Sequence, residues 1–333
     1  MTQPVPSKER KNRLGAPWYF AGVDDTVFVI ANPAAGGGRG ARILAAVERA
    51  TRSRRNLVVH VTRSPGDETR LAQHAIASGA STVIAVGGDG TWSKVAGALL
   101  RSERRPRLAL IAAGTGNDFA KSVGAPAEDI GRTLELIEAG ASRRVDVGTV
   151  EGRFFLVCCG FGFDAAVLQR MRFVRGLRGS ARYVYAALRE LSAYPGFDVA
   201  VAAAEPGRSG RGGADMRRLL MLVIANARHY GGAFRIAPRA SLTDGKLDAI
   251  AVTPLPALRR LALLASATRG AHLGSPAVDA TQREWFDLRF PSPPLYNLDG
   301  DLFQARTKAL RVAALRGALE IVARERDDQH APY

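Results

Sequence analysis

The sequence has few cysteines, few lysines and no long apolar run, and each shortage excludes a class of protein. Cys158 and Cys159 are the only cysteines in 333 residues, so a disulfide framework is excluded. The two lie side by side in an apolar stretch, which is typical of buried thiols in a reducing compartment. No stretch reaches the roughly 20 apolar residues that a membrane-spanning helix needs. The basic N-terminus is not followed by an apolar segment, so we expect no signal peptide.

The charge is strongly positive, and almost all of it comes from arginine. The chain has 47 basic against 31 acidic residues, a formal net charge of +16, and only six of the basic residues are lysine. Such an excess suits nucleic acid, an anionic membrane or a phosphorylated substrate. An arginine-rich, alanine-rich composition also arises from genome coding bias, so charge alone does not choose among these partners. With 47% apolar and 23% charged residues, the composition is that of a globular protein.

The first half of the chain has the pattern of an α/β domain. Residues 1–24 are polar and basic and are predicted to be a mobile leader. Short apolar segments then alternate with segments of helical periodicity, which predicts a parallel sheet covered on both faces. The predicted strands are 27–30, 57–61, 82–86 and 108–112. We therefore expect an α/β domain at 25–145.

The pattern changes after residue 145. One helix is predicted over 167–192 and another over 255–269, with a glycine- and arginine-rich hairpin connection at 205–215. The remaining apolar segments are strand-like and predict a mainly antiparallel, sandwich-like β domain over 146–325, whose C-terminal end could return to the first domain. These segments are 198–203, 219–226, 247–253, 285–290 and 309–323.

Three glycine-rich turns follow the first, third and fourth predicted strands, at 32–40, 87–91 and 114–119. The carboxyl ends of parallel strands share one edge of a sheet, where ligands bind. Glycine lets the backbone approach a phosphate, and a following helix offers unpaired N–H groups. Asp89 is an acid within this set, which favours Mg²⁺ between its carboxylate and a polyphosphate. The dinucleotide G-x-G-x-x-G and the Walker sequence are both absent.

Several motifs together resemble the diacylglycerol kinase catalytic-domain family, in its soluble bacterial lipid kinase branch, to which sphingosine kinases are related. The resemblance covers about residues 27–322. Its motifs are Gly87-Gly88-Asp89-Gly90-Thr91, Gly114-Thr115-Gly116-Asn117-Asp118-Phe119-Ala120, Asp146-Val147-Gly148, Gly160-Phe161-Gly162-Phe163-Asp164-Ala165, Ala225-Asn226, the run from Gly231 to Pro238, Asp244-Gly245-Lys246-Leu247-Asp248 and Leu298-Asp299-Gly300-Asp301.

The resemblance implies roles for individual residues. Asp301 takes the position of the proton acceptor, with Asp299 two residues away and on the same face if the segment is extended. A structural Mg²⁺ would be held by Asp244 and the carbonyls of Ser241 and Lys246, with Asp146 and Asp248 in the acidic network beside it. ATP would contact Asn32, Pro33, Gly36, Thr62, Gly87, Gly88, Asp89, Gly90, Thr91, Gly114, Thr115, Asn117 and Asp118.

Four positions depart from the family pattern. Lys94 stands where the family has Glu, Ala112 where Pro is common, Val157 where Asn is frequent, and Asp301 where Glu is usual. None of these changes removes a phosphate-binding glycine or Asp89. They leave open a slow or altered activity.

The residues and the resemblance together predict an ATP- and Mg²⁺-dependent lipid kinase that phosphorylates a hydroxyl of diacylglycerol or a related lipid. We expect a cytoplasmic protein in peripheral contact with the anionic inner membrane, and we leave a homodimer open. The arginine-rich, amphipathic segment 167–190 suits a membrane interface, or equally a solvated helix packed on the β domain. Two alternatives are a soluble-substrate kinase of the NAD kinase type and a weakly active nucleotide or lipid sensor. No nucleic-acid-binding motif accompanies the charge.

Overall fold

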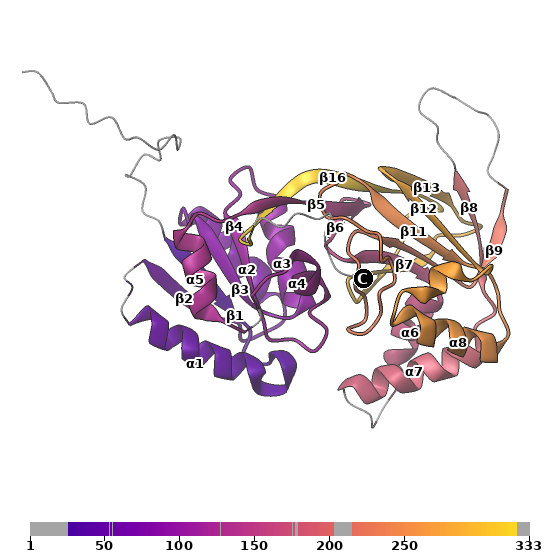
Figure 1. Cartoon of the computed structure of the whole chain (residues 1–333), viewed down its shortest axis with the longest axis horizontal. Helices are drawn as coiled ribbons and strands as arrows, with labels where there is room; N and C mark the ends of the chain where they lie inside the picture. Colours follow the sequence, from indigo (N-terminus) through magenta and orange to yellow (C-terminus); the bar gives the residue numbers. More distant parts are fainter. Residues whose placement is uncertain are drawn as a thin grey trace, which may run out of the picture.

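The computed structural model describes residues 26–324, apart from residues 53, 55, 127, 175, 177, 178 and 203–214. The chain forms an N-terminal and a C-terminal lobe, which lie side by side in Figure 1. The predicted leader and nearly all of the predicted 205–215 connection lie outside the described residues.

The N-terminal lobe contains the predicted parallel sheet. Its strands are β1 (Val27–Ala31), β2 (Leu57–Val61), β3 (Thr82–Gly87) and β4 (Arg107–Ala112), in the order β2-β1-β3-β4. Side chains alternate along β1, so Phe28 and Ile30 face one side while Val27 and Val29 face the other.

Helices cover both faces of this sheet. The helices are α1 (Arg39–Thr51), α2 (Asp67–Ala77), α3 (Asp89–Leu100), α4 (Asp118–Val123) and α5 (Ile130–Glu138), with a short 3-10 turn at Ala35–Gly38. Helices α2 and α3 pack on the Phe28 side, whereas α1 and α5 pack on the Val29 side. Trp92 on α3 is fully buried and its indole N–H donates to the Ala85 carbonyl (3.1 Å), which fixes α3 directly behind the edge where β3 ends.

The C-terminal lobe is the predicted antiparallel β sandwich. One sheet has the order β12-β11-β10-β7-β14-β15. It packs on a second layer, β8 (Phe197–Ala202), β9 (Arg217–Leu219), β13 (Trp285–Arg289) and β16 (Ala309–Ile321), through buried Phe161, Phe286 and Tyr296. The strands of the first sheet are β7 (Cys158–Gly162), β10 (Met221–Ala225), β11 (Leu247–Val252), β12 (Val278–Arg283), β14 (Leu295–Leu298) and β15 (Asp301–Gln304). The predicted fold class is confirmed.

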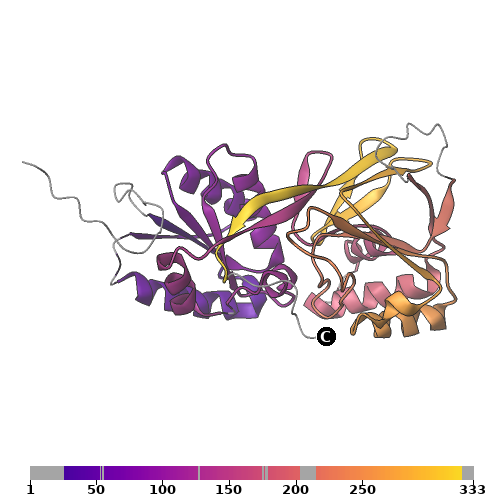
Figure 2. The same ribbon diagram turned by 45° about the horizontal axis from the view of Figure 1, so that its top comes forward.

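Strand β16 joins the two lobes. It pairs with β13 in the C-terminal lobe, runs along β5 (Arg143–Val150), and reaches β4 of the N-terminal lobe. Figure 2 shows this yellow strand crossing from one lobe to the other. Strand β6 (Arg153–Phe155) pairs with β5. Asp146 on β5 fixes the crossing, because its carboxylate accepts from the backbone N–H of Gly317 (2.7 Å) and of Gly245 (2.6 Å).

The predicted single helix over 167–192 is wrong, because two helices occupy this stretch: α6 (Phe163–Met171) and α7 (Gly179–Ala193). The sequence shows the helical periodicity of this stretch, but it has no signal for the turn after Met171. Helix α8 (Ala257–Ala267) lies within the predicted 255–269 segment and is followed by a 3-10 turn at Ala271–Gly274. Among the described residues, none of the helices combines the length and apolarity needed to cross a bilayer.

Candidate functional site

The three glycine-rich turns meet at the carboxyl edge of β1, β3 and β4. A Cβ on Gly36 would lie 1.9 Å from the Ala113 carbonyl oxygen, and a Cβ on Gly114 would lie 2.7 Å from the Gly88 Cα. Larger residues at these positions would therefore push the turns apart. Asn32 links the first two turns, since its side-chain amide donates to the Thr91 hydroxyl (3.3 Å). The predicted nucleotide-binding residues Gly36, Gly88 and Gly114 are thus brought onto one surface.

Two further features of this surface suit a phosphorylated ligand. Arg39, the first residue of α1, donates to the Gly114 carbonyl (2.5 Å) and so places a guanidinium between the first and third turns. Asn117 has a left-handed backbone (φ 56°), and its buried Oδ1 has no hydrogen-bond partner among the described residues. A buried acceptor without a donor is costly, so this atom fits a ligand that carries an N–H or O–H group. Arg39 lacks a motif signal and was not predicted.

Asp89 begins α3 and lines a hollow between the lobes, which we call the central hollow. The hollow is also lined by Thr115 and Gly116 from the third turn and by Tyr183 and Tyr230 from the C-terminal lobe. The Asp89 carboxylate accepts from the Phe119 N–H (3.1 Å). Burial, with a smaller contribution from Asp118, raises the pKa of Asp89 above its usual value. A carboxyl group with a raised pKa is suited to accept a proton near neutral pH.

Asp118, a predicted nucleotide-binding residue, lines the central hollow and also contacts the C-terminal lobe. Its two carboxylate oxygens accept from the Gly232 N–H (3.0 and 3.1 Å), and Lys121 donates to the Gly232 carbonyl (2.7 Å). We call Asp118, Lys121 and Gly232 the Gly232 clasp. Because Gly232 belongs to the C-terminal lobe, the side chain of Asp118 holds the lobes together beside the third turn.

Asp299 lies half-buried in a tight turn, not in the extended segment on which its predicted alignment with Asp301 depended. Asp299 and Gly300 both have left-handed backbones (φ 49° and 96°). The Asp299 carboxylate accepts from the Ser93 hydroxyl (2.7 Å) and from three backbone N–H groups, those of Leu156 (2.7 Å), Val157 (2.9 Å) and Cys158 (3.1 Å). Burial nevertheless raises its pKa. The carboxylate therefore ties α3 to the start of β7.

Asp301 lies in a second hollow, on the other side of the Asp299 turn. It is exposed at the start of β15, and the hollow is lined by three cationic side chains, Lys94, Arg101 and Arg153. We call this the basic hollow. Asp299 lines both hollows, whereas Asp301 lines only the basic one of the two. Lys94 and Asp301, which both differ from the family pattern, thus line the same hollow.

The predicted metal-binding turn is formed by oxygen ligands of the kind that Mg²⁺ prefers. Asp244 is the carboxylate of this set and accepts from the Lys246 N–H (2.9 Å) and the Gln282 side-chain amide (3.0 Å). Burial and the neighbouring Asp244 raise the pKa of Asp146, and they raise that of Asp248 to about 6. No group of three acidic, histidine or cysteine side chains converges on one point in the described residues, so a cation here would depend on Asp244, on carbonyls such as those of Ser241 and Lys246, and on water.

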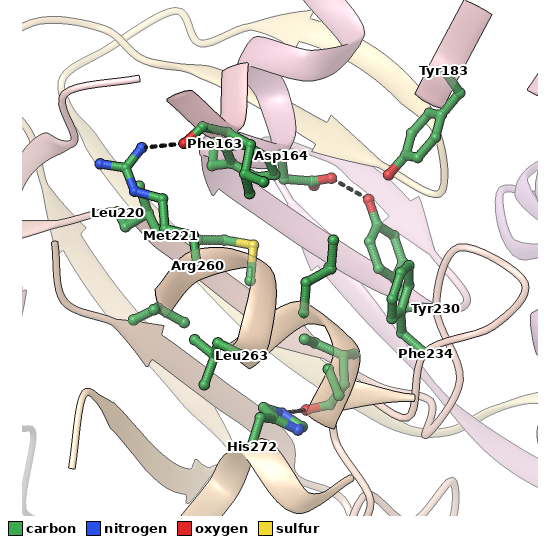
Figure 3. A pocket seen from close by; sticks show the side chains of 15 residues that line it. Phe163, Asp164, Tyr183, Leu220, Met221, Tyr230, Phe234, Arg260, Leu263 and His272 are labelled. Atoms are coloured by element: carbon green, nitrogen blue, oxygen red, sulfur yellow. Dashed lines mark hydrogen bonds between the residues drawn. The ribbon is translucent and has the colours of Figure 1, made fainter. Parts of the chain in front are cut away.

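An apolar pocket opens beside the central hollow, and its lining residues were not predicted. Figure 3 shows its lining side chains, with the hydroxyl of Tyr230 directed at the carboxylate of Asp164. Tyr183 and Tyr230 line both this pocket and the central hollow. The remaining lining is mostly apolar and comes from α7, α8, the region of β10 and β11, and the segment that connects these two strands, including Leu191, Leu220, Met221, Phe234, Ile236, Val252, Leu263 and Leu264.

Asp164 is the polar centre of the pocket wall. Its carboxylate is buried, which raises its pKa, and it accepts from Tyr230 and from the Asn297 side-chain amide (2.8 Å). Asn297 in turn accepts from the Gly300 N–H (2.8 Å). A hydrogen-bonded chain thus runs from the Asp299 turn to the apolar pocket. An acid directly after the apolar run 154–163 was the available signal for Asp164, whereas Tyr230 and Asn297 had none.

Comparison with known proteins gives matches along nearly all of the described chain. Residues 26–150 match the diacylglycerol kinase catalytic domain, and residues 158–323 match the YegS C-terminal NAD kinase beta sandwich-like domain. A "Probable lipid kinase YegS-like" of Pseudomonas aeruginosa (strain UCBPP-PA14) is 32% identical over 281 residues, which cover 84% of this chain and 88% of that protein.

Two further relatives extend the comparison. The diacylglycerol kinase of Bacillus subtilis (strain 168) is 26% identical over 243 residues, covering 73% of this chain and 78% of that protein. The crystal structure of a diacylglycerol kinase from Bacillus anthracis str. Sterne superposes with a TM-score of 0.65, covering 90% of this chain and 96% of that one at 21% identity. The second likeness is one of fold.

Proposed function

The chain belongs to the YegS-like lipid kinases with a diacylglycerol kinase catalytic domain, and from this membership we propose that it transfers the γ-phosphate of ATP to a hydroxyl of diacylglycerol or a related lipid. Kinase and lipid kinase follow from the family. The lipid, the need for Mg²⁺ and action at the cytoplasmic face of a membrane are our proposal.

The observation that carries the proposal is the contact between two sites of opposite character. Thr115 and Gly116 of the third turn line the central hollow together with Asp89, and Tyr183 and Tyr230 continue from that hollow into the apolar pocket. A molecule with an apolar tail in the pocket would therefore present its polar end to the central hollow. Diacylglycerol has this form, with one free hydroxyl beside two acyl chains.

We propose that Asp89 receives the proton of the attacking hydroxyl. The hydroxyl oxygen forms a bond to the γ-phosphorus, the bond from that phosphorus to the β–γ bridging oxygen breaks, and the products are ADP and a lipid phosphate. Phosphoryl transfer depends mainly on positioning and on electrostatic stabilisation. Asp89 lines the hollow that joins the two sites, whereas Asp301, the proton acceptor by resemblance, lies in the basic hollow.

The residues present fit Mg²⁺ at one turn of the C-terminal lobe, where Asp244 with the Ser241 and Lys246 carbonyls would hold a structural ion. The raised pKa of Asp146 beside this turn reflects an acid that a nearby cation would stabilise in the ionised form. When bound with ATP, Mg²⁺ supplies positive charge that offsets the charge of the phosphates. In this proposal Asp89 receives the proton and is not a ligand of that ion.

The apolar pocket also bears on the alternative of an NAD kinase-like enzyme. A nucleotide acceptor carries several charges and hydroxyls, and it would need polar partners. The pocket next to Asp89 instead presents leucine, methionine, isoleucine and aromatic side chains, with Asp164 and Tyr230 as its main polar groups. This lining favours a lipid acceptor over a dinucleotide.

The test is a transfer assay with radiolabelled ATP and Mg²⁺, using a panel of lipids in mixed micelles and NAD as a parallel acceptor. We expect a labelled lipid product and none from NAD. Labelled NAD phosphate without a lipid product would overturn the proposal, and nucleotide binding without any product would favour the sensor. A matched pair of variants locates the pocket: Leu263→Trp fills it, whereas Leu315→Trp adds the same bulk on β16 at an exposed position outside the pocket. The first is expected to lose lipid transfer and the second to keep it.

A further inference from the structure

We propose that the outer faces of α7 and α8 form one docking face for an anionic phospholipid bilayer. The inference rests on the proposed lipid kinase function, and it names the surface and the partner through which that function would reach its substrate. We define the docking face by Val184, Tyr185 and Leu188 on α7 and Leu258 and Leu261 on α8.

These five side chains are large, apolar and open to solvent. Leu258 is 83% exposed, Leu188 57%, Val184 51%, Leu261 49% and Tyr185 46%. Residues 184, 185 and 188 share one side of α7, and residues 258 and 261 share one side of α8. Single exposed apolar residues need no explanation, whereas a contiguous group of them marks an interaction site.

The two helices form one layer. Arg260 of α8 donates to the carbonyls of Leu191 (3.0 Å) and Tyr194 (2.8 Å) at the end of α7. Figures 1 and 2 show α7 and α8 side by side at the same end of the C-terminal lobe. The apolar residues on both helices are therefore parts of a single surface.

The inner side of the same layer is the wall of the apolar pocket. Tyr183 of α7 and Leu263 and Leu264 of α8 line the pocket. Both helices thus carry apolar side chains on two sides, one toward the pocket and one toward solvent. A helix that only covers a core keeps its outer side polar, so the outer apolar residues require a partner of their own. A lipid from a bilayer on this face would have to pass only one layer of helix to reach the pocket.

The charge beside the apolar residues identifies an anionic bilayer as that partner. Arg189 and Arg259 are exposed and directly follow Leu188 and Leu258. Helix α8 contains no acidic residue, and the acid of α7, Glu190, is buried and paired with Arg170. Apolar residues that insert, next to cations that meet phosphate headgroups, are the features of a helix lying in a membrane interface.

The experiment is co-sedimentation of the full chain with vesicles of phosphatidylcholine containing about one third phosphatidylglycerol, and with vesicles of phosphatidylcholine alone, which separates the electrostatic from the apolar contribution. The test variant is Leu188→Gln with Leu258→Gln. Both side chains are mostly exposed, so the fold should tolerate the change. The matched control is Val58→Gln with Leu315→Gln, which removes two exposed apolar residues elsewhere.

We expect at least a tenfold loss of binding to anionic vesicles for the test variant and no loss for the control. Arg189→Gln with Arg259→Gln should weaken binding and reduce its dependence on salt, whereas Arg42→Gln on the exposed side of α1 should not. Equal loss in the control pair, or binding to neutral vesicles as tight as to anionic ones, would overturn the proposal. The proposal would also be overturned if the test variant bound anionic vesicles as well as the natural chain does. It would be overturned, too, if the only change in the test variant were a shift from dimer to monomer in sedimentation.

A second measurement separates this inference from the proposed function. Transfer to a short-chain diacylglycerol dispersed as monomers does not require a bilayer. The test variant is expected to keep this transfer and to lose transfer to lipid in vesicles. If the natural chain phosphorylates no lipid in either form, the proposed function fails, and the vesicle binding still decides whether the docking face exists. If the test variant loses both transfers equally, the surface has no separate docking role.

Discussion

The two lobes build their parts of the site in different ways. In the N-terminal lobe the candidate phosphate surface is made of backbone, at turns where Gly36, Gly88 and Gly114 allow approaches that a Cβ would block. In the C-terminal lobe the pocket is made of side chains from α7, α8, the region of β10 and β11, and the segment that connects these two strands. A backbone site demands glycine at fixed positions, whereas an apolar pocket demands only volume and apolarity. The first kind of site leaves a motif and the second does not.

The largest expected effect comes from the acid on which the two lobes converge. Asp89→Asn keeps the size of the side chain and removes its basicity, and we expect kcat for lipid phosphorylation to fall by about 10³-fold. Binding of an ATP analogue, measured by calorimetry, should persist within a few-fold.

Asp301→Asn is the matched comparison for Asp89→Asn. Because Asp301 lies in the basic hollow, we expect it to reduce kcat less than Asp89→Asn does. A greater loss with Asp301→Asn would assign the proton to Asp301 and would mean that the Asp299 turn moves toward the central hollow during the reaction.

The next effect tests whether the apolar pocket acts on the lipid and not on ATP. Tyr230→Phe removes the hydroxyl that donates to Asp164 and accepts from Asn297 (2.9 Å). A hydrogen bond to a charged group contributes about 1.5–3 kcal/mol, so we expect kcat/KM for the lipid to fall by at least about tenfold. The KM for ATP should not change. Phe234→Leu, a change in the same pocket that removes no polar atom, serves as the control. Equal changes in both KM values for Tyr230→Phe would show that the pocket and the nucleotide surface are not separable.

The same contrast explains what the sequence could predict. The parallel sheet was predictable because buried apolar strands such as 27–30 alternate with amphipathic helices, and the nucleotide surface because three glycine turns follow strand ends. Asp164, Tyr230 and Asn297 come from three distant segments. Only the folded sandwich brings them together, so no local pattern could group them.

Short elements with mixed polarity were missed for a related reason. Strand β12 is largely exposed, and strands β14 and β15 have four residues each, too few for a period to be read. The left-handed backbone at Asp299 makes a turn, and this turn separates the side chains of Asp299 and Asp301. Aspartate occurs both in this conformation and in extended backbone, so an extended segment and a turn were equally consistent with the sequence.

A smaller effect tests how the two lobes are joined. Lys121→Met removes the donor to the Gly232 carbonyl while keeping the length of the side chain, and the Gly232 clasp then relies on Asp118 alone. We expect the KM for lipid and the KM for ATP to rise together by a few-fold, because the ammonium contact has an exposed side and its net contribution is modest. Lys121→Arg should restore most of the loss. A rise in only one of the two KM values would mean that the clasp serves one site and does not couple the lobes.

The smallest effect concerns Asp67, whose surroundings lower its pKa instead of raising it. Burial raises the pKa of Asp164 and Asp299. At the start of α2, the Arg63 N–H (2.8 Å), the Arg70 guanidinium (3.0 Å) and the Ser64 N–H (3.0 Å) instead lower the pKa of Asp67 to about 2. A folded-state pKa below the ordinary 3.8 means that the carboxylate stabilises the fold above about pH 4 and that this stabilisation is lost as pH falls through about 2. Asp67→Asn should therefore lower Tm at pH 6, and the difference from the natural chain should shrink to nothing near pH 2.

Asp279→Asn removes an exposed carboxylate paired only with Arg217 among the described residues and should change Tm little at either pH. If the Asp67→Asn difference persisted undiminished in acid, its cause would be the altered shape of the helix start and not its charge.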